Sequence, residues 1–313
     1  MKTEKNLNYH KIKHRKTSKY HKLADRIQTI SLQTIQDEYN KLRQLPSSKL
    51  LRMSGRTRLG NKIVDAFTFV ERLHTKGHQN ISFFEFWEKR NEYKKSAHIQ
   101  KMLDFYKNRD IDEIRKYKYI YNLYFSSITI FRPIVAMEMY HRLKAKRVLD
   151  FTMGWGGRLV GACAMGLEAY YGIDVNLNLK EPYTELVSFL QSEPDHKTAI
   201  ELHFQDALAI DYTNMDYDCV LTSPPYYDIE KYRGSEGKYK TKVDWNEHFY
   251  KPLFRKTFDS LKPGGSYCLN VPEYIYQDVC LPLFGKCVRK IPLKKSERTP
   301  EYKEFVYVWN KNN

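Results

Sequence analysis

The spacing of hydrophobic positions changes character near Val148. From there on, short apolar runs alternate with amphipathic helical stretches, and acids, glycines or prolines bound the runs. Strands that alternate with helices are typical of a parallel sheet covered on both faces. We expect a Rossmann-like, doubly wound, mostly parallel α/β sheet. The strands are predicted at 147–150, 168–174, 199–204, 217–221 and 266–271, the helices at 156–165, 180–190 and 247–261, and a closing hairpin at 288–292 and 304–309.

The earlier part of the chain has helical rather than strand periodicity. Apolar residues recur at helical spacing over 23–43, and residues 61–74 and 82–120 show the same pattern. This part is therefore predicted to be mainly helical. The expected core side chains are Phe83, Phe84, Phe86, Trp87, Met102, Phe105 and Tyr106.

Charge separates the two parts further. Residues 1–125 hold 28 Lys and Arg against 13 Asp and Glu, so most of the net charge of +16 lies there. A basic module joined to a nearly neutral one is typical of a polyanion-binding arm on a catalytic body, although a solvated lysine-rich surface has the same composition. We expect a flexible basic tail over 1–22, a helical basic region for nucleic-acid recognition over 23–125, and a catalytic domain over 126–313.

Composition narrows the class of protein. No apolar run approaches the ~20 residues of a membrane span, and the N-terminus lacks the apolar stretch of a secretion signal. The five cysteines contain no C-x-x-C pair, which favours reduced thiols and a cytoplasmic protein, bacterial or in a virus-infected cell. Neither a membrane partner nor a metal site is predicted, and the oligomeric state is left open.

Acids and glycines gather where the predicted strands end. Residues 150–158, D-F-T-M-G-W-G-G-R, end the first strand and open a helix, so backbone N–H groups are available to an anion there. Asp174 ends the second strand, where a carboxylate can accept hydrogen bonds from a ribose diol. Asp206 ends the third strand and is placed to bind an adenine amino group. The carboxyl ends of parallel strands form one edge, so these groups are expected to lie together.

The fourth strand ends in Thr222-Ser223-Pro224-Pro225-Tyr226. Proline has no N–H and a fixed φ, so the strand stops and the Pro224 carbonyl is free to face a ligand. Ser223 adds a hydroxyl, and Tyr226 adds a ring on which a base can stack. Taken alone, this motif is equally consistent with a simple turn at the end of a strand. The three acids at the ends of the preceding strands favour a binding site.

In this order the motifs resemble those of the S-adenosylmethionine-dependent DNA amino-methyltransferases. The resemblance covers about residues 126–313. It implies that Ser223, Pro224, Pro225 and Tyr226 receive a flipped base, and that S-adenosyl-L-methionine is the cofactor. The F-x-P segment (Phe131, Pro133) would lie beside the cofactor carboxylate. The implied cofactor-binding residues are Phe131, Pro133, Asp150, Thr152, Gly154, Gly156, Asp174 and Asp206.

The resemblance implies a site-specific DNA methyltransferase, of the kind found in restriction-modification systems and in phage or large-virus genomes. The serine version of the motif favours N4 of cytosine over N6 of adenine without deciding between them. DNA is expected to contact the basic N-terminal region and the loop 228–244. Two alternatives remain: an RNA base methyltransferase, and an inactive nucleic-acid-binding protein with the same fold. A nicotinamide-dependent dehydrogenase would share the glycine loop but leaves S-P-P-Y unexplained.

The sequence also departs from the family pattern. Phe151-Thr152 replaces the usual Pro-Phe after the first acid, so the aromatic contact to the cofactor has no obvious source. Trp155 either replaces that contact or packs internally. The segment after Tyr226 is short for a separate target-recognition domain, which is why we assign recognition to the N-terminal region.

Overall fold

The structure is a computed structural model that describes residues 18–53, 57–77, 79–125, 128–227, 231, 237–293 and 304–312. Residues 1–17 of the predicted tail 1–22, and residues 228–230 and 232–236 of the predicted loop 228–244, lie outside the described residues, so the expectations placed on them stay predictions. The prediction of a flexible tail is wrong for residues 19–22, because they form the first turn of a helix that begins at Lys19 and is capped by Ser18. Of residues 51–53 and 304 only the backbone is described.

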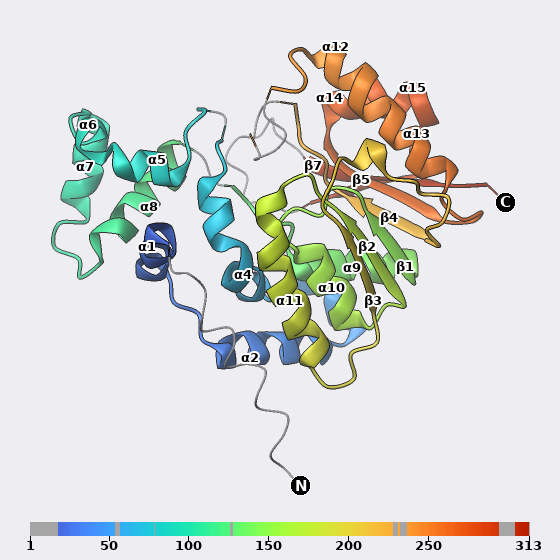
Figure 1. Cartoon of the computed structure of the whole chain (residues 1–313), viewed down its shortest axis with the longest axis horizontal. Helices are drawn as coiled ribbons and strands as arrows, with labels where there is room; N and C mark the ends of the chain where they lie inside the picture. Colours follow the sequence, from blue (N-terminus) through green and yellow to red (C-terminus); the bar gives the residue numbers. More distant parts are fainter. Residues whose placement is uncertain are drawn as a thin grey trace, which may run out of the picture.

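A seven-stranded sheet with the order β3-β2-β1-β4-β5-β7-β6 forms the centre of the described chain (Figure 1). The first five strands run parallel, and β7 pairs antiparallel with both β5 and β6. The predicted doubly wound, Rossmann-like fold is confirmed. The strands are β1 (Arg147–Asp150), β2 (Ala169–Ile173), β3 (Ala199–His203), β4 (Cys219–Thr222), β5 (Ser266–Pro272), β6 (Arg289–Pro292) and β7 (Glu304–Asn310).

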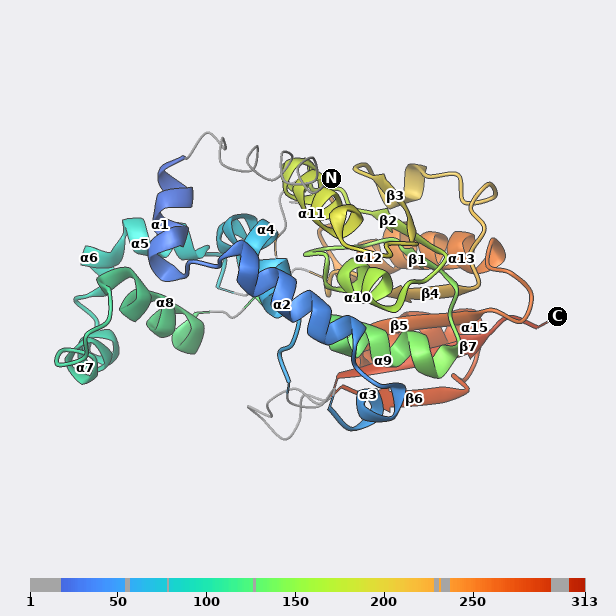
Figure 2. The same cartoon turned by 90° about the horizontal axis from the view of Figure 1, so that it is seen from below.

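Side chains alternate between the two faces of the sheet, as the pleat of a strand requires. On β1, Val148 belongs to the hydrophobic core of one face and Leu149 to that of the other. The first face is covered by α9 (Pro133–Leu143), α10 (Gly157–Met165) and α11 (Lys180–Ser192), with η2 (Leu177–Leu179) leading into α11 (Figure 2). The second is covered by η3 (Ala207–Ala209), α12 (Lys242–Trp245), η4 (Asn246–Tyr250), α13 (Lys251–Asp259), α14 (Glu273–Ile275), η5 (Tyr276–Cys280) and α15 (Leu281–Phe284).

The N-terminal region is helical, as predicted, but part of it shares its core with the sheet. Side chains of α2 and α4 pack in the same hydrophobic cluster as α9, α10 and α11, whereas α1 and α5 to α8 form a lobe with a cluster of their own (Figure 1). Phe69 and Leu73 of α4 enter the lobe cluster, so α4 joins the two. The helices are α1 (Lys19–Ile27), α2 (Leu32–Arg43), α3 (Ser47–Met53), α4 (Asn61–His74), α5 (Phe83–Glu88), α6 (Arg90–Tyr93), α7 (Ala97–Phe105) and α8 (Glu113–Tyr124).

Some sequence expectations need correction. The helix expected over 23–43 is two helices, because the Ser31 side chain caps the start of α2 by accepting from the Thr34 amide. The placement of Phe105 in the core is wrong. Its side chain is 57% exposed, since α7 buries only Ile99 and Phe105 is its last residue. No helix of the described residues is long and apolar enough to cross a membrane.

Candidate functional site

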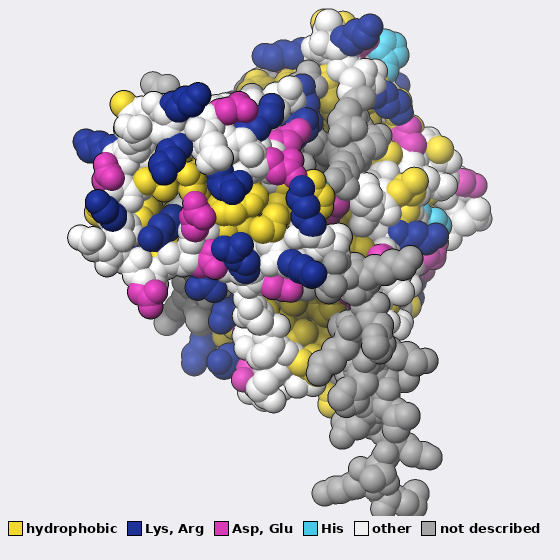
Figure 3. Space-filling model, turned by 60° about the vertical axis from the view of Figure 1, so that its left-hand side comes forward, with side chains coloured by type: hydrophobic (Ala, Val, Ile, Leu, Met, Phe, Trp, Pro, Cys, Tyr) yellow, Lys and Arg dark blue, Asp and Glu magenta, His cyan; other side chains and the backbone are white. Residues whose placement is uncertain are grey.

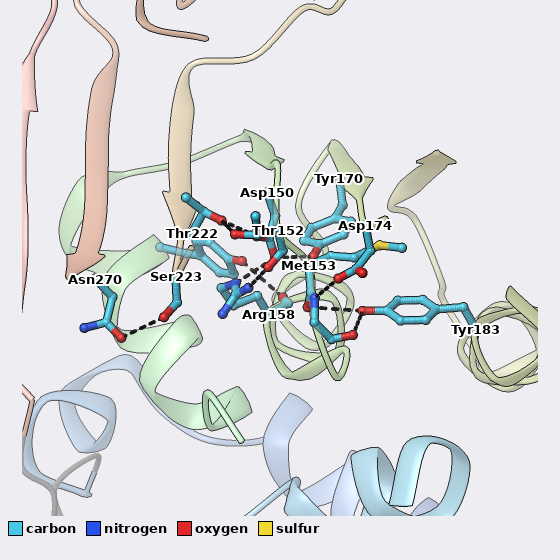
Figure 4. Close-up of polar contacts among 12 residues, drawn as sticks. Asp150, Thr152, Met153, Arg158, Tyr170, Asp174, Tyr183, Thr222, Ser223 and Asn270 are labelled. Atoms are coloured by element: carbon cyan, nitrogen blue, oxygen red, sulfur yellow. Dashed lines mark hydrogen bonds and ion pairs between the residues drawn. The ribbon is translucent and has the colours of Figure 1, made fainter. Parts of the chain in front are cut away.

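The winding of the sheet reverses between β1 and β4, which lie side by side at its centre. Ligands of doubly wound sheets bind at such a reversal, beyond the carboxyl ends of the strands. The loops that leave β1 and β4 are joined there. Thr152 Oγ1 and Thr222 Oγ1 are 2.7 Å apart, and Thr222 Oγ1 donates to Asp150 Oδ1 at 2.8 Å (Figure 4). The glycine loop and the S-P-P-Y motif are therefore held next to each other.

Asp150 is hydrogen-bonded to residues on both sides of this junction. It is 0% exposed, and its Oδ2 accepts hydrogen bonds from Arg158 Nε and from the Tyr170 hydroxyl, both at 2.6 Å. Arg158 also donates to the Thr152 carbonyl at 2.5 Å. Burial acts to lower the pKa of Arg158, but the charge of Asp150 raises it above the ordinary value, so the guanidinium stays charged. Because Asp150 is fully buried, any help it gives a cofactor would be through the shape of the loop.

The glycine loop is fixed from the neighbouring elements. The Met153 amide donates to the Ile173 carbonyl at 2.8 Å, and the Tyr183 hydroxyl of α11 donates to the carbonyls of Met153 and Gly154 at 3.2 and 3.0 Å. Gly154 and Gly156 have φ values of +55° and +92°, a region that favours glycine. The loop thus has one backbone shape before any ligand arrives.

The helix start that follows is buried and has no side-chain cap. Gly156 precedes the first turn of α10 and offers no side chain to cap it. A Cβ on Gly157 would come within 1.9 Å of the Phe131 carbonyl, so the F-x-P segment lies directly against this turn. The Arg158 guanidinium lies 5.0 Å from the centre of the Phe131 ring. Pro133 begins α9, and its carbonyl would be 2.8 Å from a Cβ on Gly161. Phe131 and Pro133 therefore lie beside the glycine loop and the start of α10.

Asp174 lies at the end of β2 on the other side of the loop (Figure 4). Its Oδ2 accepts from the Gly154 amide and its Oδ1 from the Asn176 amide, both at 2.9 Å. Burial raises the pKa of Asp174 to about 6, against the two amide hydrogen bonds, which lower it. Each oxygen keeps a lone pair for a further donor, so the carboxylate suits a diol.

Asp206 is more exposed and has a basic partner. Its Oδ1 accepts from the Leu208 amide at 3.0 Å, and its Oδ2 forms an ion pair with Lys238. Burial acts to raise the pKa of Asp206, but the hydrogen bond from Lys238 holds it below the ordinary value. Lys238 comes from the loop expected to contact nucleic acid. A ligand amino group at Asp206 would share this carboxylate with Lys238.

The S-P-P-Y segment is held by β5 and by the π-helical turn η4. Ser223 Oγ donates to Asn270 Oδ1 at 3.3 Å, and the Tyr226 hydroxyl donates to the Asn270 carbonyl at 3.0 Å. Asn270 Nδ2 in turn donates to the Phe305 carbonyl at 3.1 Å, which fixes the amide so that its oxygen faces Ser223. Sequence reasoning missed Asn270. The available signal was an amide inside the apolar run S-Y-C-L-N-V-P, where a buried polar side chain requires partners.

A tyrosine that the sequence did not single out holds the second proline of the motif. The Tyr250 hydroxyl donates to the Pro225 carbonyl at 2.6 Å and accepts from the Tyr227 amide at 3.0 Å. Burial raises the pKa of Tyr250 well above its ordinary value, so the phenol keeps its proton. Within the part of the chain that the structure describes, no donor is hydrogen-bonded to the Pro224 carbonyl.

The N-terminal helices also reach the site. Thr68 of α4 donates to the Trp155 carbonyl at 3.1 Å, and Asn176 donates to Glu71 of α4 at 3.1 Å. Trp155 is buried, and its ring packs in the hydrophobic core that α4 shares with the sheet. After α4, Lys76 forms an antiparallel bridge to Lys231, with N–H···O distances of 3.3 and 2.8 Å. The loop after Tyr226 therefore meets the N-terminal region.

No family model matches the sequence, and no curated protein matches it. Several solved structures are similar in backbone. A putative class I S-adenosylmethionine-dependent methyltransferase from Listeria monocytogenes is 15% identical over 90% of this chain and 89% of its own, with a TM-score of 0.44. TrmN from Thermus thermophilus is 18% identical over 57% of this chain and 48% of its own, about half its length, with a TM-score of 0.40. An RNA methyltransferase from Salinibacter ruber, in complex with S-adenosyl-L-homocysteine, is 15% identical over 59% of this chain and 95% of its own, with a TM-score of 0.38. The strand order and register described above, rather than these similarities, define the fold.

Proposed function

We propose that this protein is an S-adenosylmethionine-dependent methyltransferase that methylates an exocyclic amino group of a nucleobase. The observation that carries the proposal is the junction of β1 and β4. There the Thr152–Thr222 and Asp150–Thr222 hydrogen bonds hold a glycine loop and an S-P-P-Y segment side by side at the reversal of the sheet.

The residues around the glycine loop fit the parts of S-adenosylmethionine. The first turn of α10 has no side-chain cap and has Phe131 and Pro133 beside it, so it suits the carboxylate of the methionine end. Asp174 has one lone pair left on each oxygen for the ribose hydroxyls, and Asp206 suits the adenine amino group once Lys238 shares or leaves it. Thr152, Gly154 and Gly156 shape the loop. When bound, the cofactor supplies an activated methyl group on a sulfonium.

The S-P-P-Y segment is prepared to accept two N–H bonds. Ser223 Oγ donates to Asn270 Oδ1 and lies 3.1 Å from the Tyr226 hydroxyl, which donates to the Asn270 carbonyl, so one lone pair of Ser223 Oγ remains available. An amino group that donates to Ser223 Oγ and to the Pro224 carbonyl loses conjugation with its ring and becomes pyramidal. These hydrogen bonds strengthen as the nitrogen attacks the methyl group, which lowers the barrier. The proton leaves after transfer, so a strong general base is not required.

We propose DNA as the polymer, with cytosine N4 ahead of adenine N6 because of Ser223. A base inside a duplex is out of reach of such a segment, so it would be flipped out and stacked on Tyr226. Pro225, fixed by Tyr250, sets the direction of the turn. The excess of Lys and Arg in residues 1–125 supplies the attraction to phosphates. RNA would be attracted in the same way, so it is the second candidate.

The test is methyl transfer from labelled S-adenosylmethionine to duplex DNA, single-stranded DNA and RNA, followed by nucleoside mass spectrometry. We expect N4-methylcytosine in DNA. Pro224→Ala and Tyr226→Ala should abolish transfer while cofactor binding, measured by calorimetry, persists. Methylated RNA alone would replace DNA with RNA. Full activity of either variant would remove the motif from the reaction, and failure of the wild type to bind S-adenosylmethionine would leave an inactive binding protein.

A further inference from the structure

A group of large apolar side chains is exposed on α7 and α8 of the N-terminal lobe. Phe105, Tyr119 and Leu123 are 57%, 47% and 52% exposed, and the partly buried Tyr106 lies among them. Their rings form a continuous row, with centroid distances of 5.1 Å between Phe105 and Tyr106 and 5.8 Å between Tyr106 and Tyr119. We call these four residues the aromatic surface.

Tyr106 packs against the core of the lobe, whereas Phe105, Tyr119 and Leu123 lie outside that core. Ile99 of α7 and Ile114, Tyr117, Ile120 and Tyr121 of α8 fill it and are buried. Tyr119 and Leu123 are one helical turn apart on the outer side of α8. Figure 3 shows apolar side chains gathered on one face of the molecule, with Lys and Arg around them and Asp and Glu interspersed. A contiguous exposed apolar patch with a charged rim marks an interaction site.

The charges at this patch favour an anionic partner. Arg109 lies over the Phe105 ring, 4.4 Å from its centre, and 5.5 Å from that of Tyr106. Of the four lysines on the two helices and their connection, Lys118 lies over rings of the lobe core, and the other three are Lys101, Lys107 and Lys116. In the described part of the chain, neither they nor Arg109 form an ion pair, whereas Lys19 pairs with Glu88 and Arg26 with Asp112 elsewhere on the lobe. Residues 97–124 hold four acids, Asp104, Asp110, Asp112 and Glu113, against six Lys and Arg, and Asp112 is paired with Arg26, so this segment remains basic.

We propose that the aromatic surface binds an unpaired stretch of nucleic acid, with bases stacked on Phe105 and Tyr119 and phosphates beside the four cations. Aromatic rings in a basic setting are the means by which proteins hold single strands, because every base offers a flat face. A duplex hides those faces within its own stack, so it would gain from the cations alone. This assignment rests on the proposed function and deepens it: it names single-stranded nucleic acid, or a locally opened duplex, as the form that the lobe holds.

The test measures binding without chemistry. Fluorescence anisotropy of the full chain with a labelled single strand of about 15 nucleotides, at about 0.1 M salt, compares the wild type with the double variant Phe105→Ala/Tyr119→Ala. We expect the double variant to lose at least about tenfold in affinity, since each stacked base is worth about 1–3 kcal/mol. Duplex binding should change much less. Both side chains are exposed, so circular dichroism and thermal unfolding should match the wild type.

Two further variants sharpen the result. Val288→Ala removes an equally exposed apolar side chain (58%) outside the lobe and should leave binding unchanged. Phe105→Trp keeps a stacking ring, should retain affinity, and should show fluorescence quenching when a strand binds. Unchanged single-strand affinity in the double variant would overturn the proposal. So would self-association of the wild type that the double variant abolishes, because the patch would then bind a second copy of the chain.

The outcomes separate this proposal from the proposed function. S-adenosylmethionine affinity of the double variant should equal that of the wild type. The aromatic surface is on α7 and α8, whereas the glycine loop and Asp174 follow β1 and β2. A wild type that binds single strands through Phe105 and Tyr119 but methylates none of the polymers would refute the proposed function and leave this surface standing. If the wild type methylates one of the polymers and the double variant binds single strands as tightly as the wild type, the proposed function stands and the role of the aromatic surface is refuted.

Discussion

Asp174 carries the charge on which ribose recognition would depend, and its environment opposes that charge. Burial raises its pKa to about 6 from 3.8, despite the amides of Gly154 and Asn176. A folded-state pKa above the unfolded value means that Asp174 contributes stability fully below about pH 4, and that this contribution is lost as pH rises through 6. The ligand-free protein therefore tolerates this carboxylate at some cost, which is a common property of binding sites.

Cofactor affinity should have the opposite pH dependence. A ribose diol donates to the carboxylate, so the ionised form binds, and affinity should be full above about pH 6 and fall as pH drops through that value. Calorimetry between pH 5 and 8 (about the range in which such a group titrates) checks this. The Asp174→Asn variant should bind the cofactor about 1–3 kcal/mol more weakly than the wild type, and its affinity should not change with pH over this range. A wild-type profile as flat as that of the variant would exclude Asp174 from ribose binding.

Asn270 is a positioning residue in the proposed reaction, because it touches Ser223 and not the base. Asn270→Ala should lower kcat by about tenfold to a hundredfold and leave S-adenosylmethionine affinity unchanged. Ser223→Ala should lower kcat too. If Asn270 acts through Ser223, the double variant Ser223→Ala/Asn270→Ala should be no slower than Ser223→Ala alone. Additive losses would show that Asn270 acts by a separate route.

At the scale of elements, the close approach of α10 to the F-x-P segment determines the geometry of the loop. A Cβ on Gly157 would meet the Phe131 carbonyl at 1.9 Å, and backbone cannot move aside as a flexible side chain can. Gly157→Ala should therefore destabilise the fold by at least about 2 kcal/mol and weaken cofactor binding in the molecules that remain folded.

Gly166, at the other end of α10, provides the matched control. A Cβ there meets nothing within 4 Å, and the only cost of Gly166→Ala is its φ of +65°, roughly 1 kcal/mol. Chemical denaturation of both variants gives the comparison. Equal losses would mean that Phe131 and α10 do not approach each other as described.

At the level of the whole molecule, the charge of the basic tail should affect how tightly the protein binds nucleic acid. The structure describes α1 from Lys19, with Ser18 capping it, so a deletion should end at residue 17 rather than at residue 22. Residues 1–17 hold six Lys and Arg. Their removal should reduce nucleic-acid affinity and flatten its dependence on salt, by about 0.9 in the logarithmic slope for each phosphate that the tail had neutralised.

A variant that keeps the tail length but replaces those six residues by Gln is the control for that deletion. It should behave like the deletion, because charge and not length is the cause. An unaltered slope in both variants would remove the tail from nucleic-acid binding and leave the lobe and the loop after Tyr226 as the basic surfaces.

Much of the fold followed from local pattern. Strand runs such as 147–150 and 219–222 end at acids or prolines, and period-two alternation placed Val148 and Leu149 on opposite faces. Helix boundaries and α9 were harder to predict, because Pro133 to Leu143 is buried on nearly every side and has little amphipathic contrast. The packing of α2 and α4 on the sheet joins distant segments, which local periodicity does not record.

By itself, the sequence determined the order of the motifs: a glycine loop, two acids and S-P-P-Y at successive strand ends. Parallel strands bring their carboxyl ends to one edge, so this order already placed the groups together. Only the tertiary structure decided which side chains remain available to a ligand. Asp150 turned inward to Arg158, Trp155 packed under α4, Phe105 stayed outside, and Asn270 came to face Ser223, because each of these outcomes depends on how segments far apart in the chain pack together.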